Sequence, residues 1–208
     1  MGQFFQIHAE NPQERLIQQV VDVVEQGGVI VYPTDSGYAL GCGIGEKDAL
    51  ERIRAIRQLD KHHNFTLVCR DLSEISTYAK VDNKNYRLLK QYTPGGFTFI
   101  LQASGEVPKR LLHPKRKTIG IRVPDNAIAM ALLGALRQPM MSVSLIMPNE
   151  TIPMTDPYEI RDLLEKRVDL IIDGGFCGME PTSVVELFDD VPNIVRRGLG
   201  DVSDFEIG

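Results

Sequence analysis

The sequence lacks several features that would point directly to a class of protein. It has no tryptophan and only three cysteines, Cys42, Cys69 and Cys177, which lie far apart and form no C-x-x-C pair. This spacing argues against a disulfide framework or a zinc knuckle, and we expect a reducing, cytoplasmic location. No apolar run approaches the roughly 20 residues that a membrane span needs, and no charged start leads into an apolar signal core, so we expect no membrane partner.

Motifs of high specificity are also absent. There is no G-x-x-x-x-G-K-[ST], no G-x-G-x-x-G and no H-E-x-x-H, which excludes these forms of nucleotide, dinucleotide and zinc chemistry. His62 and His63 are adjacent, so their side chains diverge, and no third ligand follows at a helical spacing. We therefore expect no protein metal site, and favour contact of these side chains with an anion. Cys42 lies between two glycines with no base nearby, and is expected to be a small buried residue.

The remaining composition is that of a globular protein. The 208 residues are 43% hydrophobic and 25% charged, which predicts one domain over residues 1–208. A formal net charge of −5 gives no overall attraction to nucleic acid, so such a partner would need a locally basic face. One candidate is a loop that is either simply solvated or able to bind RNA, and it contains Lys109, Arg110, Lys115, Arg116 and Lys117.

Apolar periodicity and turn residues predict helices alternating with strands up to residue 172, followed by a hairpin. This order predicts an α/β fold with one twisted, open, mixed sheet flanked by helices. The first helix is expected to have Asn11 as its cap and Gly27 as its left-handed stop, and Asp125 is expected to cap a later helix. Predicted helices cover 12–26, 47–59, 73–79, 83–92, 126–136 and a segment from 157 with Ile160, Leu163 and Leu164 buried, and predicted strands cover 29–32, 65–69, 97–101, 118–123, 140–143, 168–172, 183–188 and 193–196.

Hydrogen-bonding side chains follow the strand at 29–32. Thr34, Asp35 and Ser36 come directly after Pro33, at the carboxyl end of the strand, where open α/β sheets bind ligands. Other strand ends supply hydroxyls and fixed positive charge, which together suit an anionic ligand. Each group also has a structural explanation, because Thr34 can cap a turn, a buried arginine can pair with a core carboxylate, and serines can satisfy the backbone. The groups concerned are Thr34, Ser142, Ser144, Ser183, Arg57, Arg122 and Arg196.

Six segments, taken in order, resemble the YrdC/YciO family. They are YPTDSGYALGC at 32–42, TPGGFTFIL at 93–101, IGIRVPDN at 119–126, PMMSVS at 139–144, PTSVVEL at 181–187 and IVRRG at 194–198. The resemblance covers nearly the whole chain and implies a YrdC-like (YrdC/RibB-type) fold with a concave basic face. It also implies the family reaction, in which L-threonine, bicarbonate and ATP with Mg²⁺ give threonylcarbamoyl-adenylate and pyrophosphate, for threonylcarbamoyladenosine in tRNA. Binding of double-stranded RNA or tRNA is implied as well.

The resemblance also implies roles for individual residues. Thr34, Arg122, Ser142 and Ser183 would contact the amino acid or its carbamate. Ser144 and Arg196 would face the ATP or AMP, with His63 near enough to add charge, and Arg57 would be the catalytic cation. The RNA would meet the loop from Lys109 to Lys117.

Three positions depart from the family's catalytic pattern, Arg57, Leu59 and Ile146. The Lys-x-Arg pair corresponds to Arg57-Gln58-Leu59, and the Ser-x-Asn pair to Ser144-Leu145-Ile146. Losing an arginine that stabilises transferring charge can cost about 10³-fold in rate, although Lys61, His62 and His63 could restore some of it. Three hypotheses remain: a weak or altered synthase, a non-catalytic relative that binds RNA and nucleotide, and an adenylating enzyme for a different acid. We favour RNA and nucleotide binding with residual synthase activity; the sequence leaves the oligomeric state open.

Overall fold

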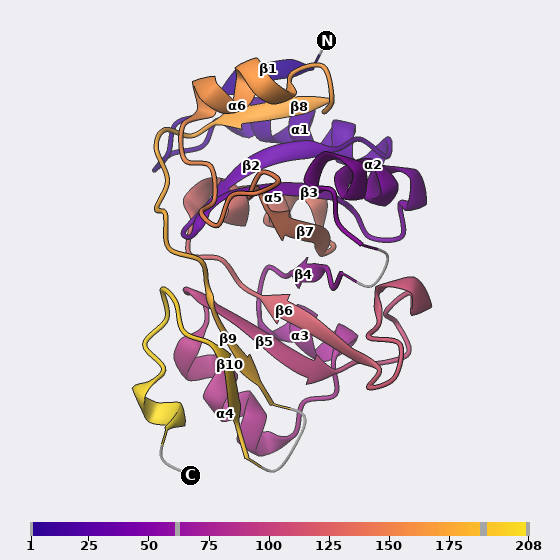
Figure 1. Ribbon diagram of the computed structural model, residues 1–208, viewed down its shortest axis with the longest axis vertical. Helices are drawn as coiled ribbons and strands as arrows, with labels where there is room; N and C mark the ends of the chain where they lie inside the picture. The colour runs from indigo at the N-terminus through magenta and orange to yellow at the C-terminus, as the bar shows by residue number, and fades with distance from the viewer. Residues whose placement is uncertain (1, 61–62, 188–190, 207–208) are drawn as a thin grey trace.

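One open mixed sheet organises the chain (Figure 1). The computed structural model describes residues 2–60, 63–187 and 191–206. Within them, ten strands follow the spatial order β1-β8-β2-β3-β7-β4-β6-β5-β9-β10, which runs from the top to the bottom of Figure 1. The predicted mixed, open sheet is therefore confirmed. The strands are β1 (Gln3–Gln6), β2 (Ile30–Thr34), β3 (Gly37–Gly43), β4 (Thr66–Val68), β5 (Phe97–Gln102), β6 (Thr118–Arg122), β7 (Met140–Ser144), β8 (Leu170–Asp173), β9 (Ser183–Glu186) and β10 (Asn193–Arg196).

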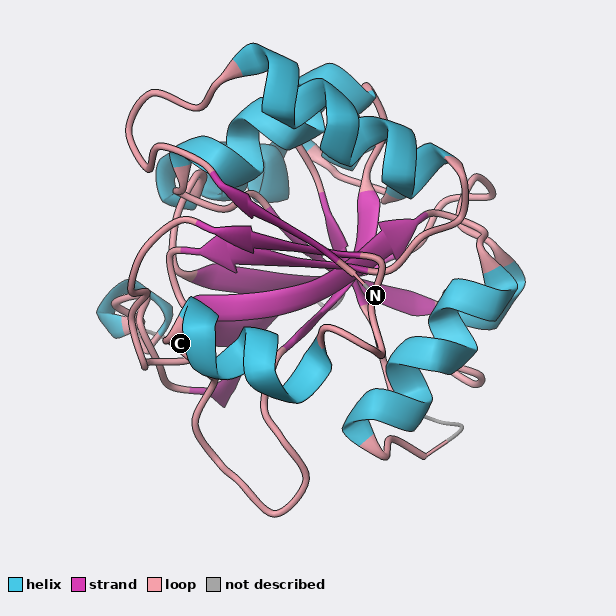
Figure 2. Ribbon diagram, turned by 90° about the horizontal axis from the view of Figure 1, so that it is seen from above, coloured by secondary structure: helices cyan, strands magenta, loops and turns pink. Residues whose placement is uncertain are grey.

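Helices lie on both sides of the strands, as the view from above shows (Figure 2). None of the described helices combines the length and apolar character needed to cross a membrane. The α-helices are α1 (Glu14–Glu25), α2 (Lys47–Arg57), α3 (Leu72–Tyr78), α4 (Asn83–Tyr92), α5 (Ala127–Leu136) and α6 (Pro157–Leu164), and two short 3₁₀ turns cover Lys109–Leu111 and Ser203–Phe205.

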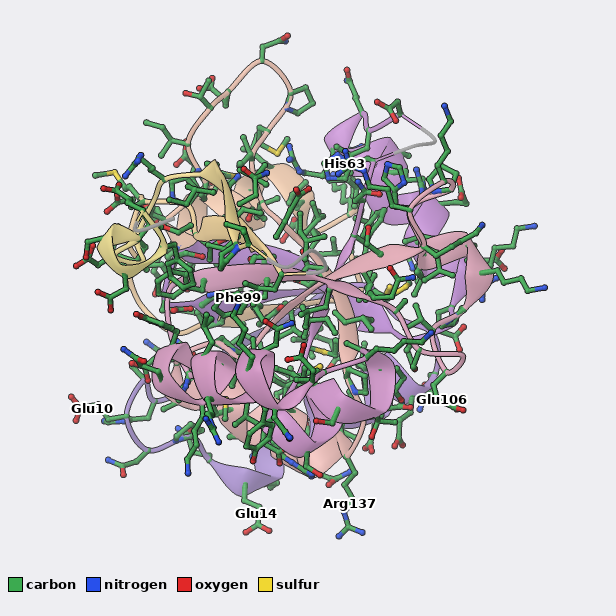
Figure 3. The ribbon with its side chains drawn as sticks, turned by 90° about the horizontal axis from the view of Figure 1, so that it is seen from below. Glu10, Glu14, His63, Phe99, Glu106 and Arg137 are labelled. Carbon is green, nitrogen blue, oxygen red and sulfur yellow. The ribbon has the colours of Figure 1, made fainter. Side chains whose placement is uncertain are left out.

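Two hydrophobic cores lie on opposite faces of the sheet. Because side chains alternate between faces along a strand, Leu67, Phe99 and Ile121 join the core that also holds the apolar side of α2. Phe99 lies in the middle of the molecule in Figure 3. The second core joins α1 and α5 to β2 and β8. The second core includes Val68 of β4 and Met140 of β7 but no described residue of β5, β6 or β9, so these two helices cover only one part of their face.

The structure corrects three local predictions. Asn11 does not cap the first helix: α1 starts at Glu14, and the backbone N–H of Asn11 donates to His8 Nδ1 instead. The cap of α5 is Asn126, not Asp125, because the Asn126 side chain accepts from Ala129 N at 3.0 Å. Leu163 is 51% exposed, since only Ile160 and Leu164 of the predicted stripe face inward. The left-handed stop at Gly27 is confirmed, with φ of +79°.

Two strands were missed, and one of them shapes the site. Strand β3 pairs antiparallel with β2 and with β7, yet its glycines hide the strand pattern. The β2–β3 turn places Thr34 opposite Gly37, which has φ of +109°. The polar residues 34–36 therefore form a hairpin turn inside the sheet rather than a loop leading to a helix. The other missed strand is β1, at an edge of the sheet. Phe188, where the predicted strand 183–188 ends, and the predicted hairpin turn at Asp189 and Asp190 lie outside the described residues.

Candidate functional site

A cavity of about 510 Å³ lies over the uncovered part of the sheet. This main cavity is within the size range of small-molecule sites, roughly 300–1,000 Å³. Hydroxyl side chains from several strands line it, together with four arginines. The hydroxyls are Thr34, Thr66, Thr98, Thr118, Ser142, Ser144 and Thr182, the arginines are Arg57, Arg116, Arg122 and Arg196, and the described lining also includes His63, His113 and the acidic Glu186. The predicted basic, hollow face is thus present.

The two serines of β7 line the cavity together, as their alternate spacing predicts. The hydroxyl of Ser142 lies 2.7 Å from the Tyr32 hydroxyl and donates to Leu40 O at 3.2 Å. Burial raises the pKa of Tyr32 to about 12, so its phenol stays protonated at neutral pH. The Ser142 side chain is thus held in place from behind the cavity wall, and Ser144, one turn of the pleat away, is less buried.

Arg122 is already paired with a carboxylate of the protein. Its Nη2 donates to Asp35 Oδ1, and its Nη1 donates to Ser36 Oγ at 3.0 Å. The Arg122 and Asp35 side chains are only 8% and 12% exposed. The structural explanation for this arginine is therefore correct, although the residue also lines the cavity. Arg122 Nε and Asp35 Oδ2 are buried without a hydrogen-bond partner among the described residues, so the pair retains unused hydrogen-bonding capacity.

Thr34 likewise serves the hairpin turn and lines the cavity. Its Oγ1 donates to Gly37 O at 2.6 Å and accepts from Ser36 N at 3.1 Å. Only 4% of the residue is exposed, but what remains faces the cavity. Capping the turn therefore fixes the Thr34 hydroxyl in one orientation at the cavity wall.

Arg196 is anchored to the neighbouring segment. Its Nε and Nη2 donate to Thr182 O at 2.9 and 2.7 Å, and Nη2 also lies 3.2 Å from Thr182 Oγ1. Burial, and then repulsion from Arg122, lower the pKa of Arg196. The two guanidinium groups are thus close enough to interact, and a bound anion would relieve their repulsion.

Arg57 and His63 line another part of the same cavity. Arg57 ends α2, burial lowers its pKa, and its Nε is buried without a hydrogen-bond partner among the described residues. The pKa of His63 is lowered first by burial and then by Arg57. His63 lies across the molecule from Glu14 and Arg137, which mark the two helices covering the other part of this face (Figure 3). Lys61 and His62 lie outside the described residues.

Two of the departures from the family's catalytic pattern, Leu59 and Ile146, differ in position. Leu59 does not line the main cavity but packs against the core beneath α2. Ile146, by contrast, lines the cavity and gives it an apolar patch beyond Ser144. The side chain of residue 59 therefore points away from the cavity and could not contact a phosphate bound there.

Ser183 was predicted to bind substrate, but its side chain is not at the cavity wall. It is fully buried, its Oγ donates to Gly200 O at 2.6 Å, and it accepts from Gly198 N at 2.9 Å. The residue before it, Thr182, lines the cavity and lies 2.9 Å from Thr98 through their hydroxyls. Four lining threonines were not predicted as site residues, namely Thr66, Thr98, Thr118 and Thr182. For the strand at 118–122, the alternation of polar with apolar residues could have indicated that Thr118 lies on the same face as Arg122.

The predicted RNA-binding residues are all exposed but fall into separate places. Arg116 lines the main cavity and pairs with Glu186 at 2.9 Å. Lys109, Arg110 and Lys117 line a second hollow of about 310 Å³, and Lys115 lines neither. The basic loop thus adjoins the cavity instead of forming one flat patch.

The remaining candidate groups are Cys42 and the possible metal ligands. Cys42 is fully buried in the core, as predicted, and burial raises the pKa of its thiol to about 12. Among the described residues, no group of three or more His, Cys, Asp or Glu side chains is placed to hold a metal ion.

Comparison with known proteins relates the whole chain to one family. The model of the Sua5/YciO/YrdC family, described as telomere recombination, matches residues 22–198. The uncharacterized protein YciO of Escherichia coli is 62% identical over 99% of this chain and its own full length, and its crystal structure superposes with a TM-score of 0.95. A threonylcarbamoyl-AMP synthase of Vibrio vulnificus is 27% identical over 76% of this chain and 86% of its own.

A more distant structure shares the fold. Sua5 of P. abyssi, solved in complex with L-threonine, is 22% identical, with a TM-score of 0.85 over 94% of this chain and 57% of its own. The family match covers most of the chain, and the resemblance seen in the sequence motifs is confirmed. The chain belongs to the Sua5/YciO/YrdC family.

Proposed function

We propose that the main cavity binds an adenine nucleotide beside a small hydroxy amino acid such as L-threonine, and that the protein retains a low threonylcarbamoyl-AMP synthase activity. One observation carries this proposal: four arginines and a row of hydroxyls converge in one hollow of the sheet. Guanidinium groups recognise carboxylate and phosphate, and fixed hydroxyls select among small polar ligands.

Two relatives support the choice of ligands. The Vibrio vulnificus relative is named a threonylcarbamoyl-AMP synthase, and the P. abyssi structure contains L-threonine. In this chain, Thr34, Arg122 and Ser142 supply groups for the amino acid, with Arg122 offering the side of its guanidinium that Asp35 does not occupy. Ser144, His63 and Arg196 supply groups for the nucleotide.

Arg57 is the cation proposed to stabilise charge during transfer. The Arg57 guanidinium at the cavity wall, whose Nε has no hydrogen-bond partner within the described part of the chain, is available to a phosphoryl oxygen. Mg²⁺ prefers oxygen ligands and is held in such sites by one or two carboxylates together with substrate phosphates. The described lining offers only Glu186, which already pairs with Arg116, so Mg²⁺ would arrive on the phosphates of ATP.

Low turnover follows from residues 59 and 146. Leu59 packs into the core where the family pattern has an arginine, and the apolar Ile146 lines the cavity where the pattern has an asparagine. A missing transition-state arginine costs about 10³-fold or more in rate. We therefore expect binding to be retained more fully than catalysis.

The test is an assay of purified protein with ATP, L-threonine, bicarbonate and Mg²⁺, in which threonylcarbamoyl-AMP and pyrophosphate are followed by chromatography and mass spectrometry. Calorimetry measures AMP and L-threonine binding in parallel, and a panel of other small acids tests for an altered substrate. Arg57→Ala should abolish product, while the exposed Lys115→Ala should not change it. If neither AMP nor any amino acid binds, the proposal is wrong; binding without product would leave a non-catalytic relative.

A second proposed function, duplex RNA or tRNA binding, rests on the exposure of the basic loop. Backbone phosphates would meet Lys115, Arg116 and Lys117, so affinity should fall steeply with salt. Replacing all three by alanine should weaken binding about equally for different sequences, because phosphate contacts carry no sequence information. Salt-independent binding, or no binding, would refute this role.

A further inference from the structure

The second hollow continues the main cavity. It has a volume of about 310 Å³, and four residues, His63, Asn64, Phe65 and Leu111, line both spaces. His63 has been placed beside the nucleotide in the proposed function. The second hollow therefore adjoins the nucleotide part of the main cavity, with His63 at their boundary.

Basic side chains line this hollow, and no acidic residue of the described chain does. Arg54, Lys109, Arg110 and Lys117 all contribute. Arg54 is the most buried of them, with a side chain 12% exposed, and its Nε is buried without a hydrogen-bond partner among the described residues. Two groups of the chain contact Arg54: the Glu51 carboxylate lies 3.6 Å from its Nε, and the backbone carbonyl of Asp60 accepts from its Nη1 at 2.6 Å.

The loop that carries the lysines is held in shape by its own hydrogen bonds. Arg110 Nη2 donates to Gly45 O, which ties the loop to the segment before α2. His113 Nδ1 accepts from the backbone of Arg116 at 3.1 Å, and Lys117 Nζ donates to Pro114 O at 2.8 Å. A preorganised set of cations binds an anion at a lower entropic cost than free lysines do.

We propose that the second hollow binds a chain of two or more phosphates, either as the β and γ groups of a nucleotide whose base and first phosphate occupy the main cavity, or as free pyrophosphate. This proposal rests on the proposed nucleotide site. A polyphosphate matches the hollow because several negative charges in a row need several cations in a row. The proposal also explains how this chain could hold the phosphates without the arginine of the family pattern. Leu59 supplies no charge at that position, and Arg54, Lys109 and Lys117 supply positive charge from the side.

His63 forms the wall between the two spaces. Burial and then Arg57 lower its pKa, with Asp60 opposing this and Arg54 adding to it, so the folded protein favours the neutral imidazole. The cations of the loop face the hollow from the other side. Phosphates on both sides of the ring favour the protonated form, so their binding is accompanied by proton uptake and a higher His63 pKa.

The experiment compares AMP, ATP and inorganic pyrophosphate by calorimetry, using the full chain, the double variant Lys109→Ala/Lys117→Ala, and Lys90→Ala in α4 as the matched control, since Lys90 lines neither hollow. All three substituted lysines are exposed, so the variants should fold, and thermal melts check this. We expect the double variant to lose about tenfold or more in ATP and pyrophosphate affinity, because two charge-assisted contacts to the phosphates are removed. AMP affinity should change less than about twofold in the double variant and in the control, and the control should keep ATP and pyrophosphate binding.

The outcomes separate this proposal from its alternatives. Pyrophosphate binding with AMP already bound, but not with ATP bound, identifies the hollow as the place of the nucleotide tail; binding with both present identifies a separate pyrophosphate site. An equal loss for AMP and ATP, or unchanged pyrophosphate affinity in the double variant, overturns the proposal. So does a double variant that loses duplex RNA while keeping pyrophosphate. Failure of AMP to bind the wild-type protein would instead refute the proposed nucleotide site, whatever pyrophosphate does.

Discussion

The pair between Arg122 and Asp35 allows a quantitative prediction. In Arg122→Ala, Asp35 Oδ1 loses its guanidinium partner, while Oδ2 has none among the described residues to begin with. The carboxylate is only 12% exposed, so little water can replace the arginine. Breaking a buried ion pair by removing one partner costs about 3–5 kcal/mol. Since domains are stable by only about 5–15 kcal/mol, the single variant should be close to unfolding at moderate temperature.

Removing both charges should cost much less. The double variant Asp35→Leu/Arg122→Met leaves no uncompensated charge, and such replacements of buried ion pairs are often neutral in stability. Its free energy of unfolding should therefore recover most of what Arg122→Ala loses. The same double variant should fold but no longer bind L-threonine, because the guanidinium at the cavity wall is gone.

The assay is urea unfolding at pH 7.5, followed by far-UV circular dichroism because the chain has no tryptophan to report its fluorescence. The m-values of the variants should match that of the wild type, so that the midpoints report stability alone. A loss below about 1 kcal/mol in Arg122→Ala, or a double variant no more stable than the single one, would refute the view that Asp35 is held as a buried, paired carboxylate.

Three further predictions concern other residues of the site and its support. Ser183→Ala should lower the free energy of unfolding by about 1–3 kcal/mol, because Gly200 O and Gly198 N lose a buried partner. Its L-threonine affinity, measured by calorimetry, should not change. A loss of affinity with normal stability would instead make Ser183 a ligand contact. Gly198→Ala should lower the melting temperature sharply, since the added Cβ would lie 2.1 Å from Pro181 O, and a melt equal to that of the wild type would contradict this packing. The folded state lowers the pKa of His63 below its ordinary 6.5. As the pH is lowered, the unfolded chain therefore takes up a proton at this position before the folded chain does. The stability due to the neutral imidazole is thus present above pH 6.5 and declines as the pH falls below it. Urea unfolding at pH 7.5 and 5.5 should therefore show a smaller drop in His63→Gln than in the wild type, and equal drops would contradict the prediction.

Local pattern was sufficient for much of the fold. Helix α4 has the predicted bounds Asn83–Tyr92, because its caps and apolar spacing lie within one short segment. The alternation of Ser142 and Ser144 on one face follows from the period of a strand, whatever the strand packs against. Strand β3 was missed since its pairing with β2 and β7, and not the propensity of its glycines, makes it a strand.

The partners of the site residues depend on contacts that no local pattern contains. Asp35 and Arg122 are 87 positions apart, and only the twist and register of the sheet bring them into contact. The choice between Thr182 and Ser183 as the cavity residue depends in the same way on the register of β9 against β5, because a shift of one residue reverses the side chains on the two faces. The sequence could therefore supply the kinds of groups that make an anion site, but long-range strand pairing decided which of them reach it, since each side chain's face is set by its neighbours in space.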